Sequence, residues 1–241
     1  MAIYDQIPNT RWGMLPRRFI SWIELLLLAN YKRDPVDRQG LEIVKKVYAQ
    51  QSSVLAILLR GATTVLFSPG ELLNLWGHAR VMRDHGGAFA EVGAFKGDSA
   101  EVVCKVKGER MFYVFEAFGG LRGIGPGDER FRPRMFASNE ADLRRRLEIY
   151  PNTTIIAGYF PETAAPVADM RFSYVHLDVD LYGDTLAALQ FFYPRMLPGG
   201  RIISHDYGQC EGVWKAFDEF FADKHESVEP TVATQVVVTK L

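Results

Sequence analysis

Short apolar runs alternate with helix-like segments from about residue 86 onward. Runs with the length and composition of buried strands occupy residues 88–92, 111–115, 153–157, 172–177 and 201–204. Helical patterns lie at 99–107, at 187–193 (with Asp184 as the cap) and around Val213–Phe221. The run 235–239 predicts an edge or near-edge strand. This alternation predicts an α/β fold with a parallel, doubly wound sheet.

The first 85 residues have a different character and predict a helical N-terminal region, followed by an α/β domain over 86–241. Helical patterns cover 41–59 and 71–82. The apolar run 19–29 is too short to span a bilayer. We interpret it as an amphipathic helix packed on the main domain or on a second subunit, which predicts a homo-oligomer. An interfacial membrane helix is the alternative.

Composition narrows the choice of partner and compartment. A chain of 241 residues with 48% hydrophobic and 24% charged residues fits one α/β domain with an accessory region. A net charge of −1 argues against nucleic acid as a partner, and we interpret the basic runs 17–18 and 144–146 as solvated faces. Cys104 and Cys210 have no disulfide or zinc spacing, which predicts a reducing, cytoplasmic setting.

A glycine-containing turn joins the first predicted strand to its helix, in the segment EVGAFKGDS. The candidate ligand-binding residues in it are Glu91, Gly93, Gly97 and Ser99. Glycines let the backbone approach a ligand, and a helix start offers free N–H donors. Glycines four residues apart do not match the dinucleotide fingerprint and suit a cofactor without a pyrophosphate. A plain tight turn is the alternative.

Glu116 closes the second predicted strand, about twenty residues beyond Gly97, where an acid can accept the hydroxyl hydrogens of a ribose. The alternative is a helix cap or a solvated acid. Together with the glycine turn it predicts an adenosyl cofactor, either NAD or S-adenosylmethionine. Ser138 could contact the adenine or cap the helix that begins near Glu140.

Acidic residues follow two later strands, in HLDVDLY and in SHDYG. Because the carboxyl ends of neighbouring parallel strands face one crevice, Asp178 and Asp206 should converge there, with Asp180 and His205 nearby. Buried carboxylates repel each other unless a cation holds them. Their oxygens predict Mg²⁺ or a similar hard ion. Simple loop capping is the alternative.

Other segments are less specific. The loop 119–133 is rich in glycine, proline and charge, and it predicts either a lid, which we favour, or a disordered segment. Tyr159, Phe160 and Thr163 could line the pocket or form a strand-ending turn. His78 and His85 are interpreted as structural or solvated.

With these motifs in place, the chain resembles the macrocin and mycinamicin O-methyltransferases (TylF-like), which methylate deoxysugars on macrolides and related natural products. The resemblance covers roughly residues 88–225, and the N-terminal eighty residues match only loosely. It is carried, in order, by EVGAFKGDSAEVVC, FYVFEAFGGL, GYFPET, YVHLDVDLYGDTLAALQFFYPRMLPGG and HDYGQCEGVWKAFDEF.

The resemblance implies a Rossmann-like class I methyltransferase fold: seven strands, the last antiparallel, with helices on both faces. It also implies S-adenosylmethionine, Mg²⁺ and a small-molecule hydroxyl acceptor, a glycoside. The expected cofactor contacts are Glu91, Gly93, Gly97, Ser99, Glu116, Ser138 and Asp178. The expected metal ligands are Asp178, His205 and Asp206, and the candidate bases are Asp180 and His205.

Two residues depart from the family pattern. His205 stands where a second acid is common, and an imidazole suits Mn²⁺, Fe²⁺ or Zn²⁺ better than Mg²⁺. Either the metal differs, or Asp206 alone completes the site and His205 is a base or a substrate contact. Glu116 stands where aspartate is usual, which should change little.

The expected chemistry is an in-line methyl transfer to a hydroxyl that a metal orients and acidifies. Asp180 or His205, with an unperturbed histidine pKa of about 6.5, would accept the proton. A nicotinamide-dependent oxidoreductase, a non-catalytic cofactor-binding protein, and a catechol or polysaccharide acceptor are the alternatives.

Overall fold

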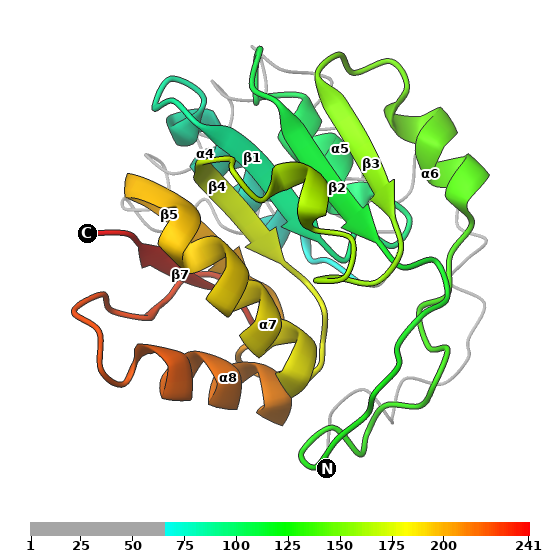
Figure 1. Cartoon of the computed structure of the whole chain (residues 1–241), viewed down its shortest axis with the longest axis vertical. Coiled ribbons are helices and arrows are strands. Elements are labelled where there is room, and N and C mark those ends of the chain that lie inside the picture. Colours follow the sequence, from blue (N-terminus) through cyan, green and yellow to red (C-terminus); the bar gives the residue numbers. More distant parts are fainter. Residues whose placement is uncertain (1–65) are drawn as a thin grey trace, which may run out of the picture. The chain divides into compact units, whose positions relative to one another are not determined.

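The computed structural model describes residues 66–241, which form an α/β fold around one seven-stranded sheet (Figure 1). The strand order is β3-β2-β1-β4-β5-β7-β6. The first five of these strands are parallel, and β7 runs antiparallel to β5 and β6. The bounds are β1 Ala88–Val92, β2 Phe112–Glu116, β3 Thr153–Ala157, β4 Phe172–Leu177, β5 Met196–Ser204, β6 Glu229–Pro230 and β7 Val236–Thr239. The predicted mostly parallel sheet and near-edge final strand are confirmed.

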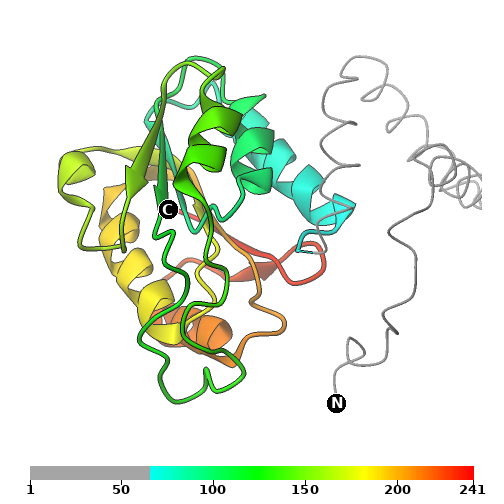
Figure 2. The ribbon, with the colours of Figure 1, turned by 90° about the vertical axis from the view of Figure 1, so that its right-hand side faces the viewer.

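Helices cover both faces of the sheet, as Figure 2 shows: α4, α5 and α6 lie on one side and α7 and α8 on the other. Their bounds are α4 Pro69–Met82, α5 Asp98–Cys104, α6 Glu140–Leu147, α7 Tyr182–Phe192 and α8 Glu211–Phe221. Because both faces are covered, the parallel strands are apolar almost throughout rather than alternating. Every residue of β1, β2 and β4 is buried.

Several element boundaries differ from the sequence prediction, among them the starts of β5 and α7. Strand β5 begins at Met196 rather than at 201, and Gly199 and Gly200 exchange backbone hydrogen bonds with Lys240. Helix α7 begins at Tyr182 with Leu181 as N-cap, and the side chain of Leu181 makes no capping hydrogen bond. Asp184 therefore lies inside the first turn, where an acid interacts favourably with the helix dipole. Its predicted role as the cap is wrong.

Helix α4 confirms the helix predicted at 71–82 and starts two residues earlier. Its N-terminus is a capping box in which Ser68 and Glu71 bond to each other's backbone N–H. The patterns at 19–29 and 41–59, the basic run 17–18 and the region 1–65 lie outside the described residues. The division at residue 85 and the homo-oligomer stay predictions. Within the described part, no helix combines the length and apolarity needed to cross a membrane.

The basic run 144–146 does not behave as one solvated face. Arg144 and Arg145 are exposed and pair within α6, as predicted. Arg146 instead turns inward, and its guanidinium lies 2.6 Å from Asp98 and 2.7 Å from Glu101. Both carboxylates belong to buried residues of α5. Arg146 therefore fastens α6 to α5.

Candidate functional site

The turn after β1 brings the ends of two strands into contact. Gly93 has φ +87°, and a Cβ atom there would lie 1.9 Å from the carbonyl oxygen of Asp178, at the end of β4. Gly97 has φ +84° and serves as N-cap of α5, where a Cβ would lie 2.5 Å from Leu143. Only glycine fits either position without a shift of the backbone or its neighbours. The predicted turn is thus required by close packing against Asp178.

Glu116 joins this turn to the loop after β2. Its Oε2 accepts a 2.6 Å hydrogen bond from the backbone N–H of Phe95, and its Oε1 accepts from Phe118 N and Ser138 Oγ at 2.9 and 3.2 Å. The structure therefore brings Glu116 together with the glycine turn and Ser138. Ser138 does not cap α6, because Asn139 accepts from the backbone N–H of Asp142 instead.

A cavity of about 480 Å³ opens beside these residues, with Phe95, Ala137, Ser138, Leu143 and Arg146 among its walls. The rings of Phe95 and Phe136 meet edge to face with centroids 6.0 Å apart. Phe95, Phe118 and Phe136 all have positive φ (48°, 59° and 60°). Such strained backbone at bulky residues gathers at ligand sites. Sequence reasoning missed these phenylalanines, since no residue-type pattern signals a left-handed phenylalanine.

Among the expected cofactor residues, Ser138 lines this cavity, whereas Glu91, Gly93, Gly97, Ser99, Glu116 and Asp178 do not. Ser99 is buried in the first turn of α5. Glu91 is fully buried on the face of β1 opposite Ala90 and Val92, and its carboxylate lies 2.8 Å from Nδ1 of His176. Contact of Glu91 and Ser99 with a cofactor stays a prediction.

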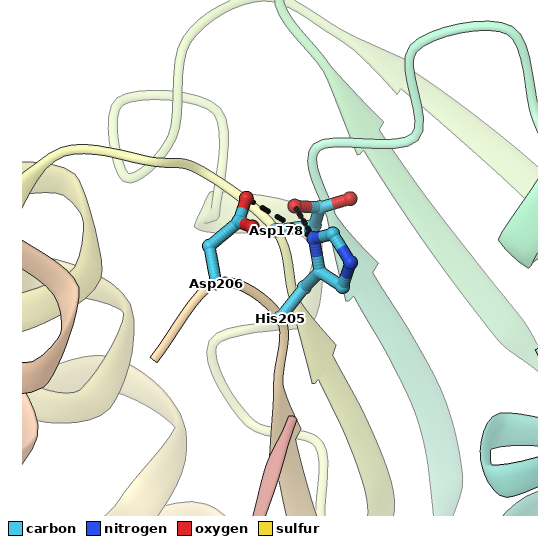
Figure 3. Close-up of side chains that lie close together, drawn as sticks. All are labelled: Asp178, His205 and Asp206. Atoms are coloured by element: carbon cyan, nitrogen blue, oxygen red, sulfur yellow. Dashed lines mark ion pairs between the residues drawn. The ribbon is translucent and has the colours of Figure 1, made fainter. Parts of the chain in front are cut away.

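The predicted acid cluster does form, at the carboxyl ends of β4 and β5 (Figure 3). Nδ1 of His205 lies 3.2 Å from Oδ1 of Asp178 and 3.1 Å from Oδ2 of Asp206. One ligand-capable atom from each of these three residues lies within 4.8 Å of the others, and Asp180, Asp206 and Cys210 form a second such group. Asp180 and Asp206 have φ of 63° and 61°, a conformation aspartate tolerates better than most residues.

Burial and mutual charge shift the pKa values in this cluster. Burial, and then the charges of Asp178 and Asp206, raise the pKa of Asp180 well above its usual range. Burial would lower the pKa of His205, but the nearby carboxylates of Asp178, Asp206 and Glu71 outweigh it and raise that pKa. Burial would raise the pKa of Asp206, but its contact with His205 leaves that pKa lowered. The charges of these neighbouring groups thus act together with burial on the pKa values of Asp180, His205 and Asp206.

The donor atoms of this cluster are of the types that bind a divalent metal. Both ring nitrogens of His205 are buried, and neither makes a hydrogen bond of acceptable geometry despite the short distances to carboxylates. Two carboxylates and one imidazole nitrogen within reach of one another are a usual donor set for first-row divalent ions. Gln209 donates to Oδ1 of Asp206 and orients that carboxylate from outside the set.

Two residues of this cluster were missed by sequence reasoning. Oε1 of Glu71 lies 3.3 Å from Nε2 of His205, and the ring of Phe67 packs against that imidazole with centroids 4.5 Å apart. Burial would raise the pKa of Glu71, but hydrogen bonds from His205 and Ser68 lower it to about 2. A capping-box pattern, serine followed three residues later by glutamate, marks the helix start in the sequence. The capping-box pattern does not predict the contact of Glu71 with His205, which is more than a hundred positions away in the chain.

The loop 119–133 is described throughout and lies beyond the carboxyl ends of the strands, beside the start of α7 (Figure 1). Asp128 accepts from the backbone N–H of Tyr182, Arg130 donates to the carbonyl of Gln209, and Phe131 is buried. Opening and closing of this loop as a lid stays a prediction.

Tyr159, Phe160, Thr163 and His78 make structural contacts. The hydroxyl of Tyr159 donates to the carbonyl of Gly120, Phe160 belongs to the core, and Thr163 donates to Tyr159, as in a strand-ending turn. His78 lies 2.7 Å from Arg201, and burial followed by that charge lowers the pKa of His78 to about 4. The structural interpretation of His78 is confirmed.

Two curated proteins are similar to this chain in sequence. The demethyldecarbamoylnovobiocin O-methyltransferase of Streptomyces niveus is 27% identical over 126 residues, which are 47% of this chain and 48% of that protein. The 8-demethyl-8-(2,3-dimethoxy-alpha-L-rhamnosyl)-tetracenomycin-C 4'-O-methyltransferase of Streptomyces olivaceus is 27% identical over 138 residues, 50% of this chain and 53% of that protein. The chain thus spans about half the length of the curated relatives it matches.

Solved structures agree on the fold. The O-methyltransferase NovP superposes with a TM-score of 0.65 at 22% identity, over 72% of this chain and 80% of that one. The calicheamicin methyltransferase CalS11 superposes with a TM-score of 0.62 at 18% identity, over 88% of this chain and 96% of that one. These likenesses confirm the class I methyltransferase fold.

The family model described as Macrocin-O-methyltransferase (TylF) matches residues 78–237, which include the glycine turn, Glu116 and the acid cluster. That match covers well over half of the chain. The chain therefore belongs to the macrocin O-methyltransferase family.

Proposed function

We propose that this protein transfers a methyl group from S-adenosylmethionine to a hydroxyl on the sugar of a natural product or glycoside, with the help of a divalent metal. The observation that carries the proposal is the contact between Gly93 and Asp178. It sets the turn that would hold the cofactor directly against a candidate metal ligand. The family match and the O-methyltransferase names of the relatives support the same reaction.

The chain's own residues would orient the cofactor. Glu116 accepts three hydrogen bonds, and a carboxylate offers about four acceptor sites, so one site on Oε2 remains for a ribose hydroxyl. Ser138 and Phe95, on the cavity wall, would border the adenosyl group. In this arrangement Gly93 and Asp178 would border the sulfonium end of the cofactor.

Asp178, His205 and Asp206 would hold the metal, which when bound would polarise and orient the acceptor hydroxyl. Asp180 is the proposed base, because one of its carboxylate oxygens lies within 4.8 Å of one from Asp206, beside the proposed metal ligands. His205 faces carboxylates through both ring nitrogens, which suits a ligand better than a base. The oxygen–carbon bond would form as the carbon–sulfur bond breaks, with the proton passing to Asp180 and S-adenosylhomocysteine leaving.

We also propose that the protein acts in the reducing cytoplasm. Cys104 and Cys210 are both free thiols and both buried. Burial raises the pKa of Cys104 to about 12, which keeps this thiol protonated and unreactive.

The test begins with calorimetric titration of S-adenosylhomocysteine, with NAD as control, into chelator-treated protein. Methyl transfer to a panel of glycosides, a catechol and a polysaccharide would then be measured with and without Mg²⁺ or Mn²⁺. We expect binding of the nucleoside but not of NAD, and metal-stimulated methylation of a glycoside.

Asp178→Asn should abolish turnover, whereas the exposed control Asp223→Asn should not change it. If the catechol or the polysaccharide were methylated in preference to the glycosides, the proposed acceptor class would be wrong. Binding without any turnover across the panel would favour a non-catalytic cofactor-binding protein, and no binding of the nucleoside would overturn the proposal.

A further inference from the structure

Glu71 is buried at the edge of the site, on α4 and ahead of residue 78, where the family match begins. Its Oε2 accepts from the backbone N–H and the hydroxyl of Ser68, each at 2.8 Å. Its Oε1 accepts from the hydroxyl of Thr234 at 2.9 Å and lies 3.3 Å from Nε2 of His205. The carboxylate is therefore fixed by three separate segments of the chain.

We propose that Glu71 is a positioning residue that accepts the Nε2 proton of His205 and leaves the Nδ1 lone pair facing Asp178 and Asp206. The inference rests on the proposed metal-dependent function. Its consequence is a preference for a first-row transition ion such as Mn²⁺ or Co²⁺ over Mg²⁺, because the set then presents one nitrogen and two carboxylates.

The argument starts from the tautomers of histidine. A neutral imidazole carries one N–H, and the nitrogen that keeps it cannot bind a metal. A carboxylate at one nitrogen holds the proton there and turns the other nitrogen toward the metal. Oε1 of Glu71 is close enough to Nε2 to do this after a small rotation of the ring, and Phe67 packs on that ring and limits larger rotations.

A second link connects Glu71 to another proposed ligand. The hydroxyl of Thr234 donates to Oε1 of Glu71 and accepts from the backbone N–H of Asp206 at 3.3 Å. One carboxylate oxygen thus reaches both residues that follow β5, His205 directly and Asp206 through Thr234. Partners of this kind around a metal site set its affinity.

Capping of α4 alone does not account for this arrangement. The capping box uses Oε2, and a glutamine can serve in such a box as well as a glutamate. The groups that face the two oxygens are donors: Ser68 on one side, Thr234 and His205 on the other. Because an amide has one acceptor and one donor end, Glu71→Gln can satisfy only one side. This makes it an informative variant.

The experiment is titration of Mn²⁺ and Mg²⁺, by calorimetry, and of Co²⁺, by its visible absorption, into chelator-treated full-length protein. Four proteins would be compared: the unchanged chain, Glu71→Gln, His205→Asp, and the double variant. We expect the unchanged chain to bind Mn²⁺ and Co²⁺ at least about 10-fold more tightly than Mg²⁺. Glu71→Gln should lose about 10- to 100-fold in Mn²⁺ affinity and shift the Co²⁺ spectrum.

The double variant separates positioning from folding. If Glu71 acts mainly through the imidazole, Glu71→Gln should lower metal affinity much less in the His205→Asp background, where only its link to Asp206 through Thr234 remains. That background should also favour Mg²⁺. A purely structural Glu71 would lower the affinity equally in both backgrounds. Binding of S-adenosylhomocysteine without metal checks that each variant is folded, and Glu71→Asp should restore part of the Mn²⁺ affinity.

Two negative results are distinguishable. If the unchanged chain binds the nucleoside but no metal, the metal-dependent function fails and Glu71 loses its proposed role with it. If the chain binds Mn²⁺ and Glu71→Gln binds it equally well, the function stands and the positioning role is overturned.

Discussion

The carboxylate of Glu116 and the backbone nitrogen of Phe95 are joined by a 2.6 Å hydrogen bond, which ties the end of β2 to the glycine turn after β1. Glu116 is buried, and its second oxygen is held by Phe118 and Ser138. An acid fixed in this way before a ligand arrives needs little reordering to bind it.

The first prediction follows from this bond. Glu116→Gln should weaken binding of S-adenosylhomocysteine about 10- to 100-fold, because hydrogen bonds to a charged group contribute roughly 1.5–3 kcal/mol each. Calorimetry measures the change. Glu140→Gln removes an exposed acid at the start of α6 and should leave the affinity unchanged. If Glu116→Gln and the unchanged chain bind S-adenosylhomocysteine equally tightly, Glu116 does not bind the cofactor.

The second prediction concerns Gly93. Gly93→Ala should lower the free energy of unfolding by about 3 kcal/mol or more, since its Cβ would lie 1.9 Å from Asp178 in a left-handed conformation. It should also weaken metal and nucleoside binding together, because Asp178 must move. Urea unfolding and calorimetry measure the two effects.

The matched control is Gly77→Ala in α4, where nothing lies within 4 Å of the added carbon. Helix propensity alone should make that variant about 0.5–1 kcal/mol more stable. A Gly93→Ala protein that unfolds and binds like the unchanged chain would contradict the close contact with Asp178.

The order of elements was predictable because the parallel strands β1, β2 and β4 are buried on both faces and so appear in the sequence as apolar runs. Strand β1 falls on the predicted residues 88–92, and β4 on 172–177. Boundaries set by pairing were not predictable: β5 extends back to Met196, where Lys240 pairs with the Gly199–Gly200 segment. Asp184 was predicted to cap α7, but the helix begins before it.

The site was predictable where strand ends determine it. Asp178 and His205 follow neighbouring strands, so a parallel sheet alone brings them together. Glu71 reaches the same place through the packing of α4, and Arg146 turns inward because buried carboxylates lie beneath it. Neither orientation follows from local pattern, since each depends on residues far away in the chain.

The third prediction is a pH dependence at the C-terminus. Glu226 accepts from Lys240 at 2.5 Å and from the hydroxyl of Tyr193 at 2.8 Å. Burial would raise the pKa of Glu226, but these hydrogen bonds lower it from 4.5 to about 2. A lowered folded-state pKa contributes stability that is present above about pH 4.5 and is lost as the pH falls through about 2.

Glu226→Gln should therefore cost about 2 kcal/mol of unfolding free energy at neutral pH. The difference from the unchanged chain should shrink steadily between pH 4.5 and 2. Urea unfolding across this range is the measurement, and Glu229→Gln, at an exposed position of β6, is the control. A difference that does not change with pH would show that Glu226 stabilises the fold through packing and not through its charge.

The last prediction compares two adjacent arginines. Arg146→Met should lower the free energy of unfolding by about 3 kcal/mol, because it takes the guanidinium away from the buried carboxylates of Asp98 and Glu101. Arg145→Met removes an exposed ion pair with Asp142 and should change stability by no more than about 0.5 kcal/mol.

Arg146 also forms part of the cavity wall and donates to the carbonyl of Lys96, within the turn that follows β1. Its loss should therefore weaken nucleoside binding as well as stability, whereas Arg145→Met should leave both unchanged. Unfolding and calorimetry on the two variants test this together. Equal behaviour would mean that the carboxylates of α5 are satisfied without Arg146, and that the cavity does not depend on the attachment of α6 to α5.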